Sequence, residues 1–528
     1  MSANPRYRHP SFWTGRTVRF CAMALLLLAL VRFGWGRYMG AQVEAQRADA
    51  KRRGEPITAS EVKLSDVTDA TNAWTLQSKA AAAAVPGVDS FRTSNLEGTS
   101  TPPYGPKWVQ LAEGSESVNG VLFALARQAR AFPNARMRDE LNPDPKALIF
   151  TGLNRARNLA NLLADGAQLM ELRRRHAEAV ERVRDLLHLA RSLRQDPYLV
   201  SQLVAIGIEA LACDSAQIIA PGLDLHAGEP GATRAAVKAL IIELLDEKNL
   251  ADSMRNSLVV ERLMLAHMLG TEGGQRHLIR PLADRALTQS NLITGIAIEA
   301  AAAPDAPTAS AILARTPSEP AINPSPFGSV IGVPANRDVP RYSRWFDWAS
   351  TPYYDKLLDR HFQNLSERRL TAVILASHLF RADRDRWPEK LEDLVPAYLP
   401  AIPRDPFRTG SPPVGYVILR KALPDHADRP LVYTEPGAID DEDAAHWHSP
   451  LYGWQQGLIN GRAARVPIRQ YRDLARFRFP DVAIKETGGA IAPRPGGGFG
   501  WVAEPDASPE GVDNDPNKSD APGKEENK

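Results

Sequence analysis

A strong apolar run without any charge lies close to the start of the chain. Residues 20–31 read FCAMALLLLALV, and Arg19 and Arg32 bound the run. Twelve residues suit the core of a signal peptide, because a membrane-spanning helix needs about 20. Arginine side chains at both ends can extend to the headgroups, so the span can be counted from Thr17 to Gly36. At about 1.5 Å per residue this stretch covers roughly 30 Å, the thickness of a bilayer core.

We therefore predict a single membrane anchor over residues 17–38 that stays uncleaved. The lipid bilayer is then the first partner of the chain. The residues expected to form the anchor are Phe20, Leu25, Leu28 and Val31, flanked by Arg19 and Arg32. Two alternatives stay open, namely a signal peptide cleaved after Ala45 and a soluble protein.

The orientation of this anchor is set by weaker signals. Arginines and lysines are frequent on both sides of the run, so the positive-inside rule does not decide. A short basic tail before one apolar run is the usual layout of a signal anchor. We therefore expect residues 1–16 in the cytoplasm, a single pass through the inner (cytoplasmic) membrane of a bacterium, and the bulk of the chain on the non-cytoplasmic, periplasmic side.

Helix-breaking composition marks the next segment, residues 39–115. Residues 53–58 read as a turn after the membrane-proximal helix, residues 79–85 are rich in alanine, and residues 99–106 (TSTPPYGP) break regular structure. We interpret this segment as a stalk or linker that joins the anchor loosely to the body.

Helical periodicity dominates residues 116–303 and predicts an α-helical bundle. Apolar residues recur every three or four positions over 155–194, which indicates one long amphipathic helix or one broken once. Residues 198–219 are apolar nearly all round but carry Gln202, Glu209 and Asp214. Three spread polar groups favour a buried bundle helix over a second membrane span.

The rest of the chain divides by proline content and charge. Eight prolines within 304–340 and an aromatic cluster after them predict a linker and aromatic segment over 304–354. Helical periodicity returns over 355–386, and strand-like pieces follow at 414–419 and 431–433. Residues 451–502 form an extension. Residues 503–528 are acidic and lack aromatic residues, so we expect a disordered tail.

The helix and strand-like pieces in the C-terminal third carry a family resemblance. Residues 381–407, RADRDRWPEKLEDLVPAYLPAIPRDPF, run from a helix through a turn at Pro388, Leu391 and Leu394 into the step IPRDPF. This pattern resembles the C-terminal globular part of type II secretion pseudopilins. Residues 432–443, VYTEPGAIDDED, look like the terminal loop of that family. The resemblance covers about 366–443 and implies a small α+β module, which we place at 355–450.

The N-terminal pilin motif of the same family is absent. Pseudopilins begin with glycine followed by an aromatic residue or methionine, with glutamate at the fifth mature position. Here Arg16 follows Gly15, and Phe20 stands at the position of the glutamate. This departure argues against processing by prepilin peptidase and against filament assembly.

In the family the terminal loop can bind calcium. Asp440, Asp441 and Asp443 offer oxygen ligands of the kind that calcium prefers. Four adjacent acids, with Glu442 among them, cannot all converge on one ion. An exposed acidic turn is therefore the preferred interpretation, calcium is the alternative, and no other cofactor is expected.

The chain carries none of the common catalytic signatures. We find no phosphate-binding GxxxxGK[ST], no GxSxG, no HExxH and no dinucleotide fingerprint. The pair His446 and His448 lacks a third convergent ligand. Two cysteines, Cys21 and Cys213, exclude a disulfide framework, and a net charge of +2 gives no case for nucleic acid as a partner.

These observations predict a mainly α protein with one N-terminal membrane helix, a helical bundle, a small α+β C-terminal module and a disordered acidic tail. The preferred hypothesis is a non-enzymatic envelope protein for interaction or scaffolding, with envelope proteins as partners and secretion as one candidate setting. The alternative is an envelope enzyme of a helical type without a known motif, acting on a cell-wall or lipid substrate.

Overall fold

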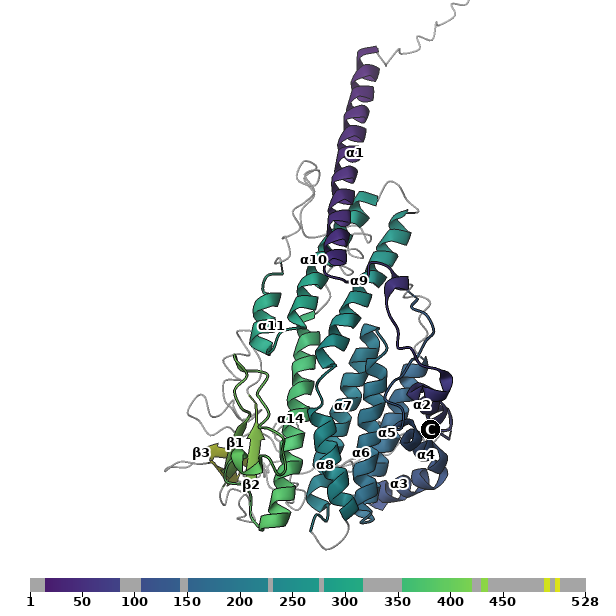
Figure 1. Ribbon diagram of the computed structural model, residues 1–528. Coiled ribbons are helices and arrows are strands. Elements are labelled where there is room, and N and C mark those ends of the chain that lie inside the picture. Colours follow the sequence, from purple (N-terminus) through teal and green to yellow (C-terminus); the bar gives the residue numbers. More distant parts are fainter. Residues whose placement is uncertain are drawn as a thin grey trace, which may run out of the picture. The chain divides into compact units, whose positions relative to one another are not determined.

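The computed structural model describes residues 15–85, 106–142, 151–226, 231–274, 280–316, 354–419, 429–434, 489–493 and 499–503. These residues are mainly helical, as predicted, with twelve α-helices and four short strands among them (Figure 1). The chain divides into two compact units, Met1–Val414 and Gly415–Lys528, which are described separately.

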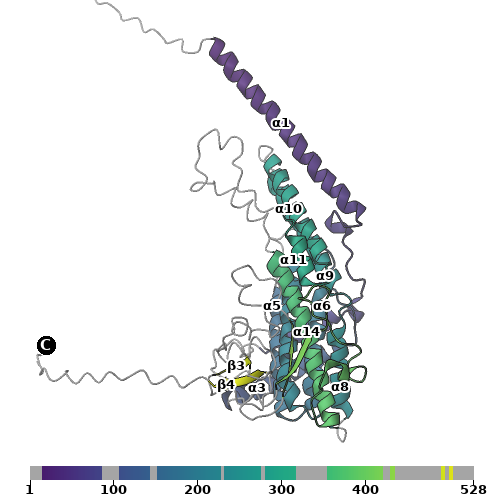
Figure 2. The same cartoon turned by 90° about the vertical axis from the view of Figure 1, so that its left-hand side faces the viewer.

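The first helix, α1 (Gly15–Arg52), has two halves of different character. Its first half is apolar, and side chains such as Phe20 and Leu25 are exposed. The helix from Val18 onward is long and apolar enough to cross a membrane, with none of its most apolar stretch buried. The second half packs against α10 (Arg280–Ala300), while the first half projects beyond the bundle (Figures 1 and 2).

A connecting segment, residues 53–72, follows α1 and contains two short 3₁₀ turns, η1 (Ala59–Glu61) and η2 (Asp69–Thr71). It leads into α2 (Ala73–Ala82), which begins where the side chain of Asn72 accepts a hydrogen bond from the backbone N–H of Trp74. The helix packs against α4 (Gly120–Ala129) and α5 (Thr151–Leu172). The loose stalk predicted over 39–115 is therefore corrected where the structure describes it: α1 and α2 both bury side chains against the bundle.

Helices α3 (Pro106–Val118), α5 (Thr151–Leu172), α6 (His176–Arg194), α7 (Leu199–Ile219) and α8 (Gly231–Leu245) complete one side of the bundle. The predicted amphipathic stretch over 155–194 is broken once, where Arg174 takes a left-handed conformation with φ 58°. In helix α7, 72% of the residues in the most apolar stretch are buried. This burial agrees with the prediction of a bundle helix and not a second span.

Helices α9 (Leu250–Gly274) and α10 pack side by side, and α11 (Ala306–Leu313) packs against α10. Asp305 caps α11 by accepting a hydrogen bond from the backbone N–H of Thr308 at 2.8 Å. This helix lies inside the segment predicted as a proline-rich linker, because Pro307 falls in its first turn, where proline is tolerated. Residues 317–353 of that predicted linker lie outside the described residues.

The longest helix after α1 is α14 (Tyr354–Arg384), and it belongs to the bundle. It packs against α7 and α8, and every residue from Asn364 to Phe380 except Arg369 is buried. The predicted boundary at 355 is thus corrected, since the first compact unit runs to Val414. After α14 the chain turns through η6 (Leu391–Leu394), where Leu391 and Leu394 are buried as the sequence pattern implied.

The second unit is described by two antiparallel strand pairs. Strand β1 (Gly415–Leu419) pairs with β2 (Arg429–Tyr433), with Val417 opposite Leu431, which confirms the two strand-like pieces. Strand β3 (Gly489–Pro493) pairs with β4 (Phe499–Ala503), which the sequence analysis did not predict. The acidic loop at 440–443 and the predicted tail from residue 504 lie outside the described residues.

Candidate functional site

The junction between the second half of α1 and α10 is built from apolar packing and an amide pair. Val43 is buried against Leu269, Ala286 and Leu287. Gln46 donates from Nε2 to the backbone oxygen of Thr288 at 2.9 Å and accepts from Nδ2 of Asn291 at 3.2 Å. Together these contacts fix the face that α1 turns toward α10.

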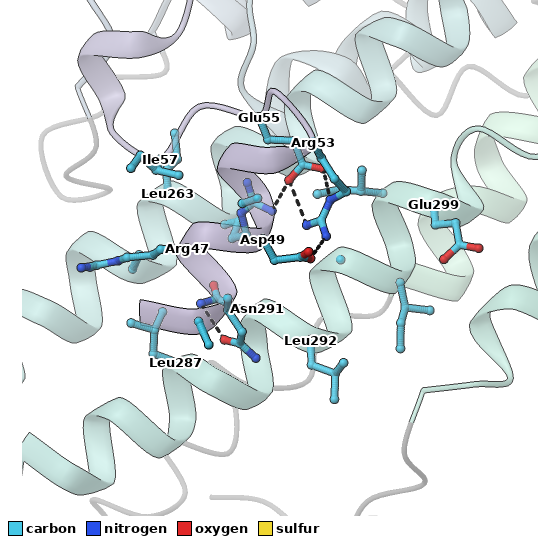
Figure 3. Close-up of a pocket in the computed structure, with 18 of the residues that line it drawn as sticks. Arg47, Asp49, Arg53, Glu55, Ile57, Leu263, Leu287, Asn291, Leu292 and Glu299 are labelled. Atoms are coloured by element: carbon cyan, nitrogen blue, oxygen red, sulfur yellow. Dashed lines mark hydrogen bonds and ion pairs between the residues drawn. The ribbon is translucent and has the colours of Figure 1, made fainter. Parts of the chain in front are cut away.

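A charged cluster lies where α1 ends (Figure 3). Arg53 donates to Asp49 on α1 and, from Nε, to Oε1 of Glu55 at 2.9 Å. Nη1 of Arg262 on α9 donates to Oε2 of Glu55 at 2.6 Å. Burial alone would raise the pKa of Glu55, but the bonds from Arg53 and Arg262 outweigh it and lower that pKa. Glu55 therefore stays ionised and ties the end of α1 to α9.

Beside this cluster a cavity of about 690 Å³ lies between α1, α9 and α10. Figure 3 shows Asp49, Arg53 and Glu55 together, with Leu287 and Leu292 in another part of the lining. This is the volume of an ordinary small-molecule pocket. One charged side and one apolar side suit an amphipathic occupant.

A second cluster is buried in the core of the bundle around Glu209 on α7. Arg194 on α6 donates to both oxygens of Glu209, from Nε at 2.9 Å and from Nη2 at 2.6 Å. Arg368 on α14 donates from Nη1 to Oε1 at 3.0 Å, and Asn364 donates to Oε2. All three helices therefore meet at one carboxylate, which is 1% exposed.

The charge state of this carboxylate follows from its neighbours. Burial would raise the pKa of Glu209, but Arg194 and Arg368 outweigh it and lower that pKa to about 2. Glu209 is ionised throughout the physiological range. It therefore acts as a fixed counter-charge for the two guanidiniums and has no proton to exchange near neutral pH.

Arg368 also closes the C-terminus of α8. Its Nε donates to the backbone oxygen of Leu244 at 3.0 Å, and its Nη2 donates to those of Glu243 at 2.9 Å and Asp246 at 2.8 Å. Carbonyl groups in the last turn of a helix lack partners within the helix. A cation there also interacts favourably with the negative end of the helix dipole. One side chain thus satisfies the carboxylate of α7 and the open end of α8.

The buried network borders a cleft of about 970 Å³. Arg194, Glu209 and Arg368 contribute to its wall, and the connecting segment after α1 borders it with Glu55, Pro56 and Val62, among others. Charged and amide side chains predominate. No aromatic side chain lines the cleft within the described part of the chain. The cleft therefore suits a polar ligand and offers no flat ring for stacking against a base or a sugar.

The residues predicted for the membrane anchor lie together on the first half of α1. Phe20, Leu25, Leu28 and Val31 are 47–67% exposed, Arg19 is exposed, and Arg32 is half-buried. The predicted acidic loop, Asp440, Asp441 and Asp443, lies outside the described residues, as do His446 and His448. Calcium at that loop stays a prediction.

The sequence pattern marks Glu209 only as a polar residue in an apolar helix. This pattern correctly predicted that Glu209 lies in a buried helix. An ionised group that is buried needs a buried partner. Its partners Arg194 and Arg368 were missed, since they lie on other helices 15 and 159 residues away.

Comparison with protein-family models, with curated proteins and with solved structures finds no match for this chain, so the resemblance to pseudopilins stays a prediction.

Proposed function

We propose that the protein is a single-pass membrane-anchored envelope protein whose bundle serves interaction or scaffolding at the membrane surface. In this proposal α1 stays uncleaved in the inner membrane, and the bundle lies on the periplasmic side. The carrying observation is the continuity of α1, whose exposed apolar half leads without a break into the half packed on α10.

Continuity of α1 supports an anchor over a cleaved signal. Cleavage after Ala45 would remove the buried Val43 and cut the helix directly before Gln46, whose side-chain hydrogen bonds join α1 to α10. Burying a side chain the size of valine contributes about 1.5–3 kcal/mol. A mature chain that starts at residue 46 would lose this packing.

The same continuity supports a fixed distance between bilayer and bundle. Val43 in the junction lies five residues after Tyr38, at the expected membrane edge, along uninterrupted helix. At about 1.5 Å per residue this separation is roughly 8 Å. A helix of that length is stiff. The bundle then binds its partners at the membrane surface. This position suits assembly with other envelope proteins, including components of a secretion system.

Extraction and protease protection of the native protein test this proposal. We expect washed membranes to retain the protein in high salt and in alkaline carbonate, and added protease to digest the bundle only from the periplasmic side. Release by salt alone, or digestion only after the cytoplasmic face is exposed, would contradict it. Recovery of a mature N-terminus at residue 46 would identify a cleaved signal.

The second candidate function is that of an enzyme, and the 970 Å³ cleft favours it because the cleft is large enough for a substrate. An envelope enzyme would act there on a polar cell-wall fragment or a lipid headgroup. The test is mass spectrometry of such substrates after incubation with the full-length protein. The exposed Asn256 lines the cleft, so an Asn256→Trp variant should fill it and abolish any turnover. Equal products with both proteins would argue against this candidate.

A further inference from the structure

A smaller cavity of about 340 Å³ lies on the side of the bundle between α4, α6 and α8. Four arginines line it, namely Arg127 on α4, Arg130 directly after α4, and Arg184 and Arg191 on α6, together with His188. Within the described part of the chain, Glu243 on α8 is the one acidic side chain in this lining. The lining thus carries four guanidinium groups against one carboxylate, which accepts a hydrogen bond from Nη2 of Arg184 at 2.6 Å. We call it the arginine cavity.

Carboxylates outside the lining orient these arginines. Asp185 accepts from Nε of Arg127 at 2.9 Å and from Nη1 of Arg130 at 3.1 Å, while Glu181 pairs with Arg130 and Arg184, each at 2.6 Å. A guanidinium has five N–H donors, so arginines held in this way keep further donors for a ligand. Preorganised donors of this kind lower the cost of binding.

Arg191 is the loosest of the four. Its Nη2 lies 3.4 Å from Oδ2 of Asp246, and its side chain is 42% exposed. It borders both the arginine cavity and the larger cleft beside it. Arg191 is thus free to turn toward a ligand without disturbing the core.

His188 supplies an independent observation. Its side chain is 8% exposed, and its ring donates a hydrogen bond to the backbone of Ala129 at the end of α4. Among the described residues, Nε2 of His188 has no hydrogen-bond partner. A buried polar atom without a partner is costly, and here it belongs to a residue that lines the cavity.

We propose that the arginine cavity binds a tetrahedral oxyanion, the phosphate or sulfate group of a soluble ligand, through Arg127, Arg130, Arg184 and Arg191, and through Nε2–H of His188 when that ring is protonated. Guanidinium groups bind such oxygens through paired, charge-assisted hydrogen bonds. Donors that approach from two helices match a tetrahedral group better than a planar carboxylate. The small volume suits the anionic group itself, with any remainder of the ligand extending past Arg191 into the larger cleft.

Two titrating groups give this site a pH dependence. Burial, then the charges of Arg191 and Arg130, lower the pKa of His188 to about 4. Burial raises the pKa of Asp185 to about 6, although Arg127 and Arg130 oppose that rise. A bound anion favours the protonated form of both groups and so raises both pKa values. Binding therefore takes up protons, and affinity rises as the pH falls toward 5.

Eight other charged groups surround His188 and Asp185. They are Arg127 on α4, Arg130 directly after it, Glu178, Glu181, Arg184 and Arg191 on α6, Glu243 on α8, and Asp246 directly after α8. Glu181 has a pKa held below its usual value by Arg130 and Arg184, against the opposing effect of burial. We assign the proton uptake to His188 and Asp185, whose pKa values without a ligand are about 4 and about 6.

Isothermal titration of the full-length protein in detergent with sodium sulfate tests the proposal, because sulfate stays a dianion at both pH values used. We expect binding at about pH 7.5 that becomes several-fold tighter at about pH 5.5. An Arg191→Gln variant should bind sulfate about tenfold more weakly, since it loses a charged hydrogen-bond donor. A His188→Gln variant should lose part of the pH dependence while Asp185 retains the rest.

Arg173→Gln is the matched control, because Arg173 is an exposed arginine paired with Glu113 outside this cavity. Equal weakening by Arg173→Gln and Arg191→Gln, or affinity that does not change with pH, would overturn the proposal. So would a lack of binding at millimolar sulfate. Glycerol phosphate and short-chain phosphatidic acid distinguish the source of the anion. Binding of phosphatidic acid alone would overturn the assignment to a soluble ligand.

Discussion

Arg368 and Glu209 come from helices far apart in the chain, and their side chains meet at 3.0 Å inside the bundle. Arg368 also carries three bonds to the carbonyls that end α8. Arg194 reaches the same carboxylate from α6. Glu209 and Arg368 together therefore connect α6, α7, α8 and α14. Removing one member of a buried ion network leaves the others uncompensated.

Replacing Arg368 with lysine should test the capping role. Lysine keeps the charge, but its single ammonium cannot reach Glu209 and three backbone oxygens together. We expect a loss of about 3 kcal/mol in the free energy of unfolding, the low end for breaking a buried charged network. Thermal unfolding followed by circular dichroism measures it. Arg360→Lys is the control, because Arg360 is exposed on the same helix.

Replacing Glu209 with glutamine should remove a specific part of the acid sensitivity. The folded pKa of Glu209 is about 2, below its usual value of 4.5. Its stabilisation is therefore fully present above pH 4.5 and is lost as the pH falls through about 2. The size of the shift corresponds to about 3 kcal/mol.

Glu209→Gln should unfold more easily at neutral pH, because two buried guanidiniums lose their counter-charge. Below pH 4.5 its stability should fall less steeply than that of the unaltered protein. Urea unfolding at a series of pH values measures both effects. Parallel pH profiles for the two proteins would contradict the assigned charge state.

The anchor junction gives a third expectation. Val43→Asp would bury a carboxylate against Leu269 and Leu287, and an unpaired buried charge is strongly destabilising. We expect the second half of α1 to separate from α10 while the protein stays in the membrane. Faster hydrogen exchange in α10 and easier proteolysis of residues 53–72 would report this. Glu44→Gln, at the exposed neighbouring position, should change neither.

The sequence predicts features that depend on neighbouring residues, and it does not predict contacts between residues far apart in the chain. The apolar half of α1, the burial of α7 and the strands β1 and β2 follow from local patterns, and the sequence predicted them. The role of Arg368 could not be predicted, because periodicity shows only that a charged residue lies on a helix. The packing of α2 was missed for a similar reason, since small alanines bury against α4 and α5 without a strong apolar signal.

The close approach of Gly222 and Glu171 gives the last expectation. A Cβ atom at position 222 would lie 1.8 Å from Oε1 of Glu171, so an alanine there must displace the carboxylate. Burial raises the pKa of Glu171 to about 7, although Arg174 opposes the rise. Because the folded pKa exceeds the usual 4.5, Glu171 favours folding below pH 4.5, and this contribution is lost as the pH rises through about 7.

Gly222→Ala should therefore turn Glu171 toward water and return its pKa toward the usual value. The flexible end of a glutamate can move at small cost, and alanine reduces the freedom of the unfolded chain, so the overall stability at neutral pH should stay within about 1 kcal/mol. The dependence of stability on pH between about 4.5 and 7 should flatten. Glu171→Gln provides the reference, since it removes the titration without the added methyl group. A Gly222→Ala protein that keeps the full pH dependence would show that the carboxylate is held elsewhere.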